Sequence, residues 1–177
     1  FLKKCKFSGI TGNPRLTKIE TLKTSYSQNS GRKILFVGTF DKDPTYTEYA
    51  YEKMFINEKV NRENAYKAIK RLYQLEYQIT YRPHPADGIS FKAKIEGMVK
   101  ISDSKLGIAE EIAKNDIIIN SGCTSSVEAY RQQKKLITFG VPYSVTSVMN
   151  GLGLYCRNVE DIINACQSKV IRKRNKR

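Results

Sequence analysis

The chain has 177 residues, of which 40% are hydrophobic and 27% are charged, so it can bury the core of one globular domain and lacks the composition of a disordered protein. No apolar stretch approaches the roughly 20 residues that span a bilayer, and no secretory signal is visible, which together predict a cytoplasmic protein. The formal net charge of +14 suggests an anionic partner, whereas a single histidine argues against a zinc site, and four cysteines without C-x-x-C spacing argue against a disulfide framework.

The chain divides into three parts by composition. It begins at Phe1, and residues 24–31 form a polar stretch typical of a linker. We therefore expect residues 1–31 to be the remnant of a preceding half and its linker, in a chain that is a piece of a longer protein. One folded domain is expected over residues 32–168, followed by a basic tail over residues 169–177.

Strands and helices alternate along the expected domain. The strands are apolar runs, and the helices repeat apolar residues every three or four positions. In chain order they are the strand Lys33–Gly38, the helix Glu63–Glu76, the strand Tyr77–Arg82, the helix Ser104–Lys114, the strand Asp116–Asn120, a helix that starts at Ser125, the strand Leu136–Phe139 and the helix Val159–Cys166. This alternation predicts an α/β fold with a mostly parallel sheet, right-handed crossovers and helices on both faces.

The loop after the strand Asp116–Asn120 carries the clearest functional signal. Ser125 and Glu128, three residues apart, predict a capping box with Ser125 as the N-cap. Unpaired N–H groups and the helix dipole would then favour an anion such as a nucleotide phosphate. In parallel sheets the ligand crevice lies at the carboxyl ends of the strands, where this loop is expected. A capping box that only begins a helix is the alternative interpretation.

Five short segments, spread over most of residues 9–166, carry a resemblance to a known enzyme family. They are Ile10-Thr11-Gly12-Asn13-Pro14-Arg15, the strand and loop Ile34–Phe40, His84-Pro85, Ser125-Ser126 with Glu128-Ala129, and Gly140-Val141-Pro142. Together they resemble the C-terminal nucleotide-binding half of a GT-B glycosyltransferase of the bacterial surface-polysaccharide group. That group includes CDP-glycerol glycerophosphotransferases, polysialyltransferases and capsule transferases.

The resemblance implies a Rossmann-like domain that binds a nucleotide-activated donor. It implies that His84 contacts the donor phosphate, that Ser125 or Ser126 binds the same group, and that Glu128 meets the ribose hydroxyls. Gly38 and Thr39, in the loop after the first strand, complete the expected donor site. The donor would be CMP-, CDP- or UDP-linked and would be a substrate, with neither cofactor nor metal required.

The resemblance leaves the catalytic base unassigned. In inverting GT-B enzymes the base usually comes from the N-terminal half, so we expect the 177-residue chain to transfer nothing on its own. Asp41 and Asp43 are interpreted as a solvated turn before Pro44. Arg82 is a weaker candidate for the donor site, because it is expected to lie too close to the sheet to reach a ligand.

The positive charge is concentrated at the two ends of the chain. Residues 1–33 carry +7 and residues 169–177 carry +6, which leaves +1 for residues 34–168. This distribution suits contact with an anionic membrane or polymer and argues against a nucleic-acid-binding core. We expect the tail to hold the protein at the inner face of the cell membrane, and a solvated tail without a role is the alternative.

Two other functions remain open from the sequence. A sugar-nucleotide 2-epimerase would share the fold and the serine- and glutamate-bearing helix start, but such enzymes usually present more histidine and acidic residues in the cleft. A non-enzymatic module could bind anionic polymer through its basic ends. The favoured interpretation is the donor-binding domain of a glycosyl- or glycerophosphotransferase of capsule, lipopolysaccharide or teichoic-acid-type polymer synthesis, with a polysaccharide or lipid-linked acceptor.

Overall fold

The computed structural model describes six stretches of the chain. They are residues 32–38, 52–84, 89–103, 105–121, 123–140 and 152–168. The predictions made for residues 1–31, for residues 169–177 and for Thr39, Asp41 and Asp43 lie outside these stretches.

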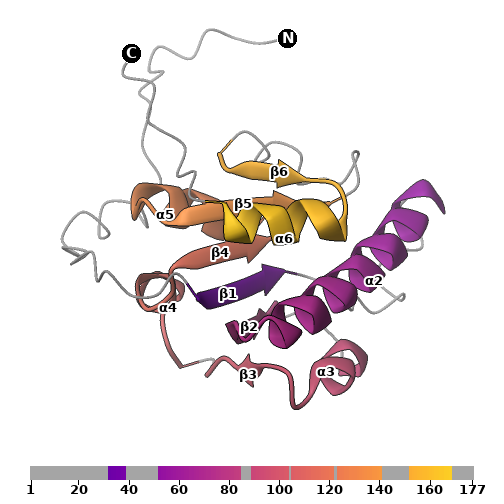
Figure 1. The fold of residues 1–177 in the computed structure, drawn as a ribbon, viewed down its shortest axis with the longest axis horizontal. Helices are drawn as coiled ribbons and strands as arrows, with labels where there is room; N and C mark the ends of the chain where they lie inside the picture. Colours follow the sequence, from indigo (N-terminus) through magenta and orange to yellow (C-terminus); the bar gives the residue numbers. More distant parts are fainter. Residues whose placement is uncertain are drawn as a thin grey trace, which may run out of the picture.

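The described strands form one six-stranded sheet that is parallel throughout (Figure 1). The strands are β1 (Lys33–Gly38), β2 (Gln78–Pro83), β3 (Lys100–Ile101), β4 (Ile117–Asn120), β5 (Lys135–Phe139) and β6 (Leu154–Cys156). Their order across the sheet is β3-β2-β1-β4-β5-β6, so β1 lies between β2 and β4. The prediction of an α/β fold with a mostly parallel sheet is therefore confirmed.

Helices cover both faces of the sheet (Figure 1). They are α2 (Glu52–Gln74), α3 (Ser90–Ile95), α4 (Ile108–Ala113), α5 (Ser125–Arg131) and α6 (Val159–Gln167). Buried residues of α2, α3 and α6 pack in one hydrophobic cluster, and those of α4 and α5 pack in a second. No helix in the described stretches is long and apolar enough to span a membrane.

Strand β1 shows how an apolar sequence specifies a central strand. Ile34 and Phe36 belong to the cluster under α2, whereas Leu35 and Val37 belong to the cluster under α4 and α5. Alternate side chains of a strand point to opposite faces, so both faces of β1 require apolar residues. Registered pairing of Leu35 with Ile118 in β4 continues the second cluster across the sheet.

Helix α2 is longer than the sequence predicted. It begins at Glu52, eleven positions before the predicted start at Glu63. The sequence did not predict these first turns, because Met54, Phe55 and Ile56 are consecutive and do not show the spacing of three or four by which a helix is detected. It ends two residues before the predicted Glu76, which adopts a left-handed φ of 62°. The N–H of Tyr77 then bonds to the carbonyl of Leu72 at 3.1 Å, in the pattern of a Schellman motif.

The predicted helix Ser104–Lys114 is wrong at its start, because α4 begins at Ile108. The carboxylate of Asp103 accepts a hydrogen bond from the N–H of Lys105 at 2.9 Å, which forms a turn, and Gly107 is extended with ψ of 141°. This turn uses the residues that the pattern had assigned to the first helical turn. Helix α3 and the short strands β3 and β6 were not predicted from the sequence.

The last helix agrees closely with its prediction. Helix α6 begins at Val159 and runs one residue past the predicted Cys166. Its N-cap is Asn158, whose side-chain oxygen accepts a hydrogen bond from the N–H of Asp161 at 2.9 Å. At its other end the Nζ of Lys135 donates to the carbonyl of Cys166 at 2.9 Å, which places a cation at the negative end of the helix dipole.

Candidate functional site

The candidate site is the carboxyl edge of the sheet at the junction of β1 and β4. From β1 the chain adds β2 and β3 on one side, and from β4 it adds β5 and β6 on the other. The order of strands therefore reverses between β1 and β4. In open parallel sheets such a reversal leaves a crevice outside the carboxyl ends, because the connections on its two sides turn to opposite faces.

Gly38 and His84 lie together at this edge. Gly38 is the last residue of β1, and it is in register with Pro83, the last residue of β2. The N–H of His84 donates to the carbonyl oxygen of Gly38 at 3.3 Å, which ties the start of the loop after β2 to the end of β1. The side chain of His84 is exposed. The two predicted residues are thus adjacent on neighbouring strands.

The predicted capping box at the start of α5 is wrong. The N-cap is Thr124, whose φ of −61° and ψ of −20° are already helical, and the N-cap makes no side-chain capping bond. Ser125 is the first helical residue, 7% exposed, and its hydroxyl lies against the sulfur of Cys123. Because that hydroxyl faces the interior, Ser125 does not cap the helix.

Ser126 joins this helix start to the end of β4. It is fully buried, and its hydroxyl donates toward the side-chain oxygen of Asn120 at 2.9 Å and toward the carbonyl of Cys123 at 2.6 Å. The amide nitrogen of Asn120 in turn donates to the carbonyl of Ile137 in β5 at 3.3 Å. A buried polar residue needs such partners, so Asn120 and Ser126 fix the loop between β4 and α5. The sequence signal for Asn120 was a polar residue closing an otherwise apolar strand.

Cys123, in the loop after β4, and Glu128, in the first turn of α5, lie near one another. Glu128 is 9% exposed, and its carboxylate lies close enough to affect the titration of Cys123. Burial raises the pKa of the Cys123 thiol, the hydrogen bond with Ser125 opposes the rise, and the charge of Glu128 adds to it. The thiol therefore remains protonated at neutral pH and is a poor nucleophile. Sequence reasoning gave Cys123 no role at this site.

Two backbone N–H groups at the start of α5 have no carbonyl partner among the described residues. The N–H of Ser126 bonds to the carbonyl of Cys123 at 3.0 Å, and the N–H of Val127 bonds to the carbonyl of Thr124 at 3.1 Å. Within the described stretches, the N–H groups of Thr124 and Ser125 donate no backbone hydrogen bond. The leading N–H groups of a helix are the ones that can donate hydrogen bonds to an external anion.

Arg82 is bound inside the protein. Its Nη1 forms an ion pair with the Oε2 of Glu111 in α4 at 2.6 Å and lies 3.4 Å from the hydroxyl of Ser102. Its guanidinium is therefore directed along the sheet face toward α4, and this geometry agrees with its ranking as a weak donor-site candidate. In the described part of the chain, no group of three or more His, Cys, Asp or Glu side chains could hold a metal ion.

Comparisons with known proteins give matches only among solved structures. No protein-family model matches the chain, and no curated protein matches it. Escherichia coli heptosyltransferase WaaC, solved with ADP-2-deoxy-2-fluoro heptose, is 15% identical with a TM-score of 0.51 over 81% of this chain and 44% of that one. This similarity confirms the Rossmann-like fold, as in one half of a GT-B enzyme.

Two further structures are similar at lower TM-score. Thermosulfurimonas dismutans KpsC, a beta Kdo 2,4 transferase, is 19% identical with a TM-score of 0.47 over 77% of this chain and 41% of that one. Methanocaldococcus jannaschii UDP-GlcNAc 2-epimerase, solved with UDP-GlcNAc and UDP, is 16% identical with a TM-score of 0.47 over 85% of this chain and 42% of that one. The chain spans less than half the length of each of these three proteins.

Proposed function

We propose that this chain is the donor-nucleotide-binding half of a GT-B-type glycosyl- or glycerophosphotransferase. The observation that supports it most directly is the meeting of three features at the reversal of strand order. Gly38 ends β1, His84 follows β2, and Ser125 begins the helix after β4, which pairs with β1. These are the positions at which an open α/β sheet receives a ligand.

The chemistry of these groups suits a nucleotide phosphate. Transfer from a nucleotide donor requires stabilisation of negative charge on the departing phosphate. The N–H groups of Thr124 and Ser125 and the imidazole of His84 can each donate a hydrogen bond to it. Glu128 would accept from the ribose hydroxyls. Because the hydroxyl of Ser126 is already used within the protein, we assign Ser126 the role of holding the loop in place.

The wider role follows from the resemblance and remains part of the proposal. The domain would act in the synthesis of a capsule, lipopolysaccharide or teichoic-acid-type polymer, on a polysaccharide or lipid-linked acceptor. The base that activates the acceptor would come from a second half. Residues 169–177, which carry six of the positive charges, would hold the enzyme against an anionic membrane surface.

Nucleotide binding tests the proposal directly. Calorimetric titration of the 177-residue chain with CMP, CDP, UDP and ADP should give one nucleotide that binds in a one-to-one ratio. His84→Gln should weaken that nucleotide by about 1–3 kcal/mol, the magnitude for a hydrogen bond to a charged group. Gln167→Ala, at an exposed residue at the end of α6 beside the first residue of β5, is the control for a neutral substitution and should leave affinity unchanged.

Two outcomes would contradict the proposal. One is that none of the four nucleotides binds to a chain whose circular dichroism shows it to be folded. The other is that a nucleotide binds but His84→Gln, Gly38→Val and the control all bind it equally well. Gly38→Val is included because a branched side chain at the end of β1 would occupy the crevice without changing any charge.

A further inference from the structure

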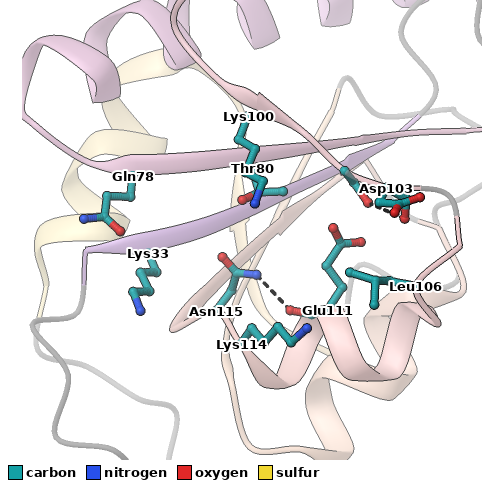
Figure 2. Close-up of a pocket in the computed structure, with 10 residues that line it drawn as sticks. Lys33, Gln78, Thr80, Lys100, Asp103, Leu106, Glu111, Lys114 and Asn115 are labelled. Atoms are coloured by element: carbon teal, nitrogen blue, oxygen red, sulfur yellow. Dashed lines mark hydrogen bonds between the residues drawn. The ribbon is translucent and has the colours of Figure 1, made fainter.

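A cavity lies away from the carboxyl edge of the sheet, on the sheet face that carries α4. It has a volume of about 280 Å³ and lies under the amino-terminal halves of β1, β2 and β3. Figure 2 shows the side chains of these strands, of α4 and of the turn before α4 around it. The lining includes Lys33, Gln78, Thr80 and Lys100 from the strands and Glu111, Lys114 and Asn115 from α4 and its end.

The cavity exists because one part of this sheet face is polar. On β1 and β4 the same face carries Leu35 and Ile118, which are buried in the cluster under α4 and α5. On β2 and β3 it carries Gln78, Thr80 and Lys100 instead. Polar side chains cannot form a dry contact with a helix without losing hydrogen bonds to water. The part of the face on β2 and β3 can therefore contact water or a polar ligand.

The cationic groups of this cavity have no anionic partners. Lys33, Lys100 and Lys114 line it, and in the described residues no carboxylate lies within 4.0 Å of their Nζ atoms. Two carboxylates, those of Asp103 and Glu111, also line the cavity, and both are bonded to other groups. Glu111 pairs with Arg82 at 2.6 Å, and the side chain of Asp103 accepts from the N–H of Lys105 at 2.9 Å.

Asp116 is not among the residues that line the cavity, and its side chain accepts a hydrogen bond from the backbone N–H of Lys33 at 3.2 Å. Three lysines line the cavity against two carboxylates, one of which is paired with Arg82, so the net charge around the cavity is positive and attracts anions. The neutral hydrogen-bonding groups between them, Thr80, Gln78 and Asn115, can bind hydroxyl groups.

We propose that this cavity binds an anionic sugar of monosaccharide size, with its phosphate or carboxylate held by Lys33, Lys100 and Lys114. The volume of about 280 Å³ lies just below the range of about 300–1,000 Å³ that is usual for ligand pockets, so a whole nucleotide sugar would not fit. The site is separate from the donor crevice, because Lys33 and Gly38 stand at opposite ends of β1, about 17 Å apart at the usual rise per residue. The proposal does not depend on the function proposed above.

Glucose 6-phosphate, glucuronate, inorganic phosphate and glucose serve as probes in titrations of the full chain followed by NMR or calorimetry. We expect glucose 6-phosphate or glucuronate to bind more tightly than phosphate, and glucose not to bind measurably. The triple substitution Lys33→Gln, Lys100→Gln and Lys114→Gln should weaken binding by at least about tenfold, as lost charge-assisted hydrogen bonds predict. Added salt should weaken binding in the same direction.

A matched control keeps the total charge change equal. Lys59→Gln, Lys70→Gln and Lys92→Gln remove three lysines from α2 and α3, which cover the opposite face, and should leave the affinity within about twofold. Thr80→Val provides a second variant that keeps every charge and should weaken the sugar more than inorganic phosphate.

The proposal is overturned if neither anionic sugar binds to the folded chain, or if the two triple variants weaken binding equally. It is also overturned if His84→Gln abolishes binding while the cavity lysine substitutions do not, since the anion would then occupy the carboxyl edge.

Discussion

The ion pair between Arg82 and Glu111 should be costly to break on one side only, because the remaining charge would be buried without a partner. The two side chains are 21% and 5% exposed, and their charged atoms lie 2.6 Å apart. Replacing Arg82 with methionine keeps the aliphatic length but leaves the carboxylate of Glu111 buried without its cation. Removing one partner of a buried pair costs about 3–5 kcal/mol, and the partial exposure of Arg82 places our expectation at the lower end, about 3 kcal/mol.

Urea unfolding followed by circular dichroism measures this cost. For a chain of this size about 3 kcal/mol corresponds to a fall in melting temperature of roughly 6–12 °C. The matched control is Arg32→Met, because Arg32 pairs with Glu76 at 3.4 Å with side chains 55% and 85% exposed. An exposed pair is worth less than about 1 kcal/mol. The double variant Arg82→Met with Glu111→Leu should recover most of the loss, since no buried charge then remains.

The exposed pair and the double variant together test this mechanism. Our account of the pair is refuted if Arg82→Met costs no more than Arg32→Met at neutral pH, or if the double variant is as unstable as the single one.

The remaining predictions concern a close backbone contact and two buried thiols. Gly153→Ala should destabilise the fold by about 1–3 kcal/mol in urea unfolding, because a Cβ there would lie 2.5 Å from the carbonyl oxygen of Leu136; Gly107→Ala has open space around its Cβ, and an equal loss there would refute the steric reason. Burial raises the pKa of Cys166 to about 12 and that of Cys156 to about 11, so both thiols should resist a disulfide reagent at pH 8 until urea unfolds the chain. If Cys156 and Cys166 react as fast in the folded chain as in the unfolded chain, burial does not protect them.

The parts of the fold with strong local signals could be predicted from the sequence. Strand β1 is a continuous apolar run and was predicted with its observed bounds, and α6 was predicted to within one residue. Helix α3, with six residues, is too short to show a period, and it is held by Phe91 and Ile95 packing into the core. The formation of α3 therefore depends on packing against residues that are distant in the sequence.

The candidate site was predictable in position and less so in detail. The alternation of strands and helices placed Gly38, His84 and Ser125 at one edge of the sheet, because parallel strands end together. The hydrogen bond from Ser126 to Asn120 could not be foreseen, since it depends on the path of the loop between them. The pairing of Arg82 with Glu111 joins residues 29 positions apart and also carries no local signal.

The central position of β1 constrains the order in which the chain can assemble. Among the described strands β1 is the first in sequence, yet it is bonded on both sides, and Ile34 pairs with Ile79 on one side and with Ile117 on the other. During synthesis from the N-terminus, the edge of β1 that pairs with β4 has no partner strand until β4 has been made. Until then that edge can pair with another chain. A substitution that slows β4 from joining the sheet should therefore increase aggregation of newly made protein, even where the stability of the finished fold changes little.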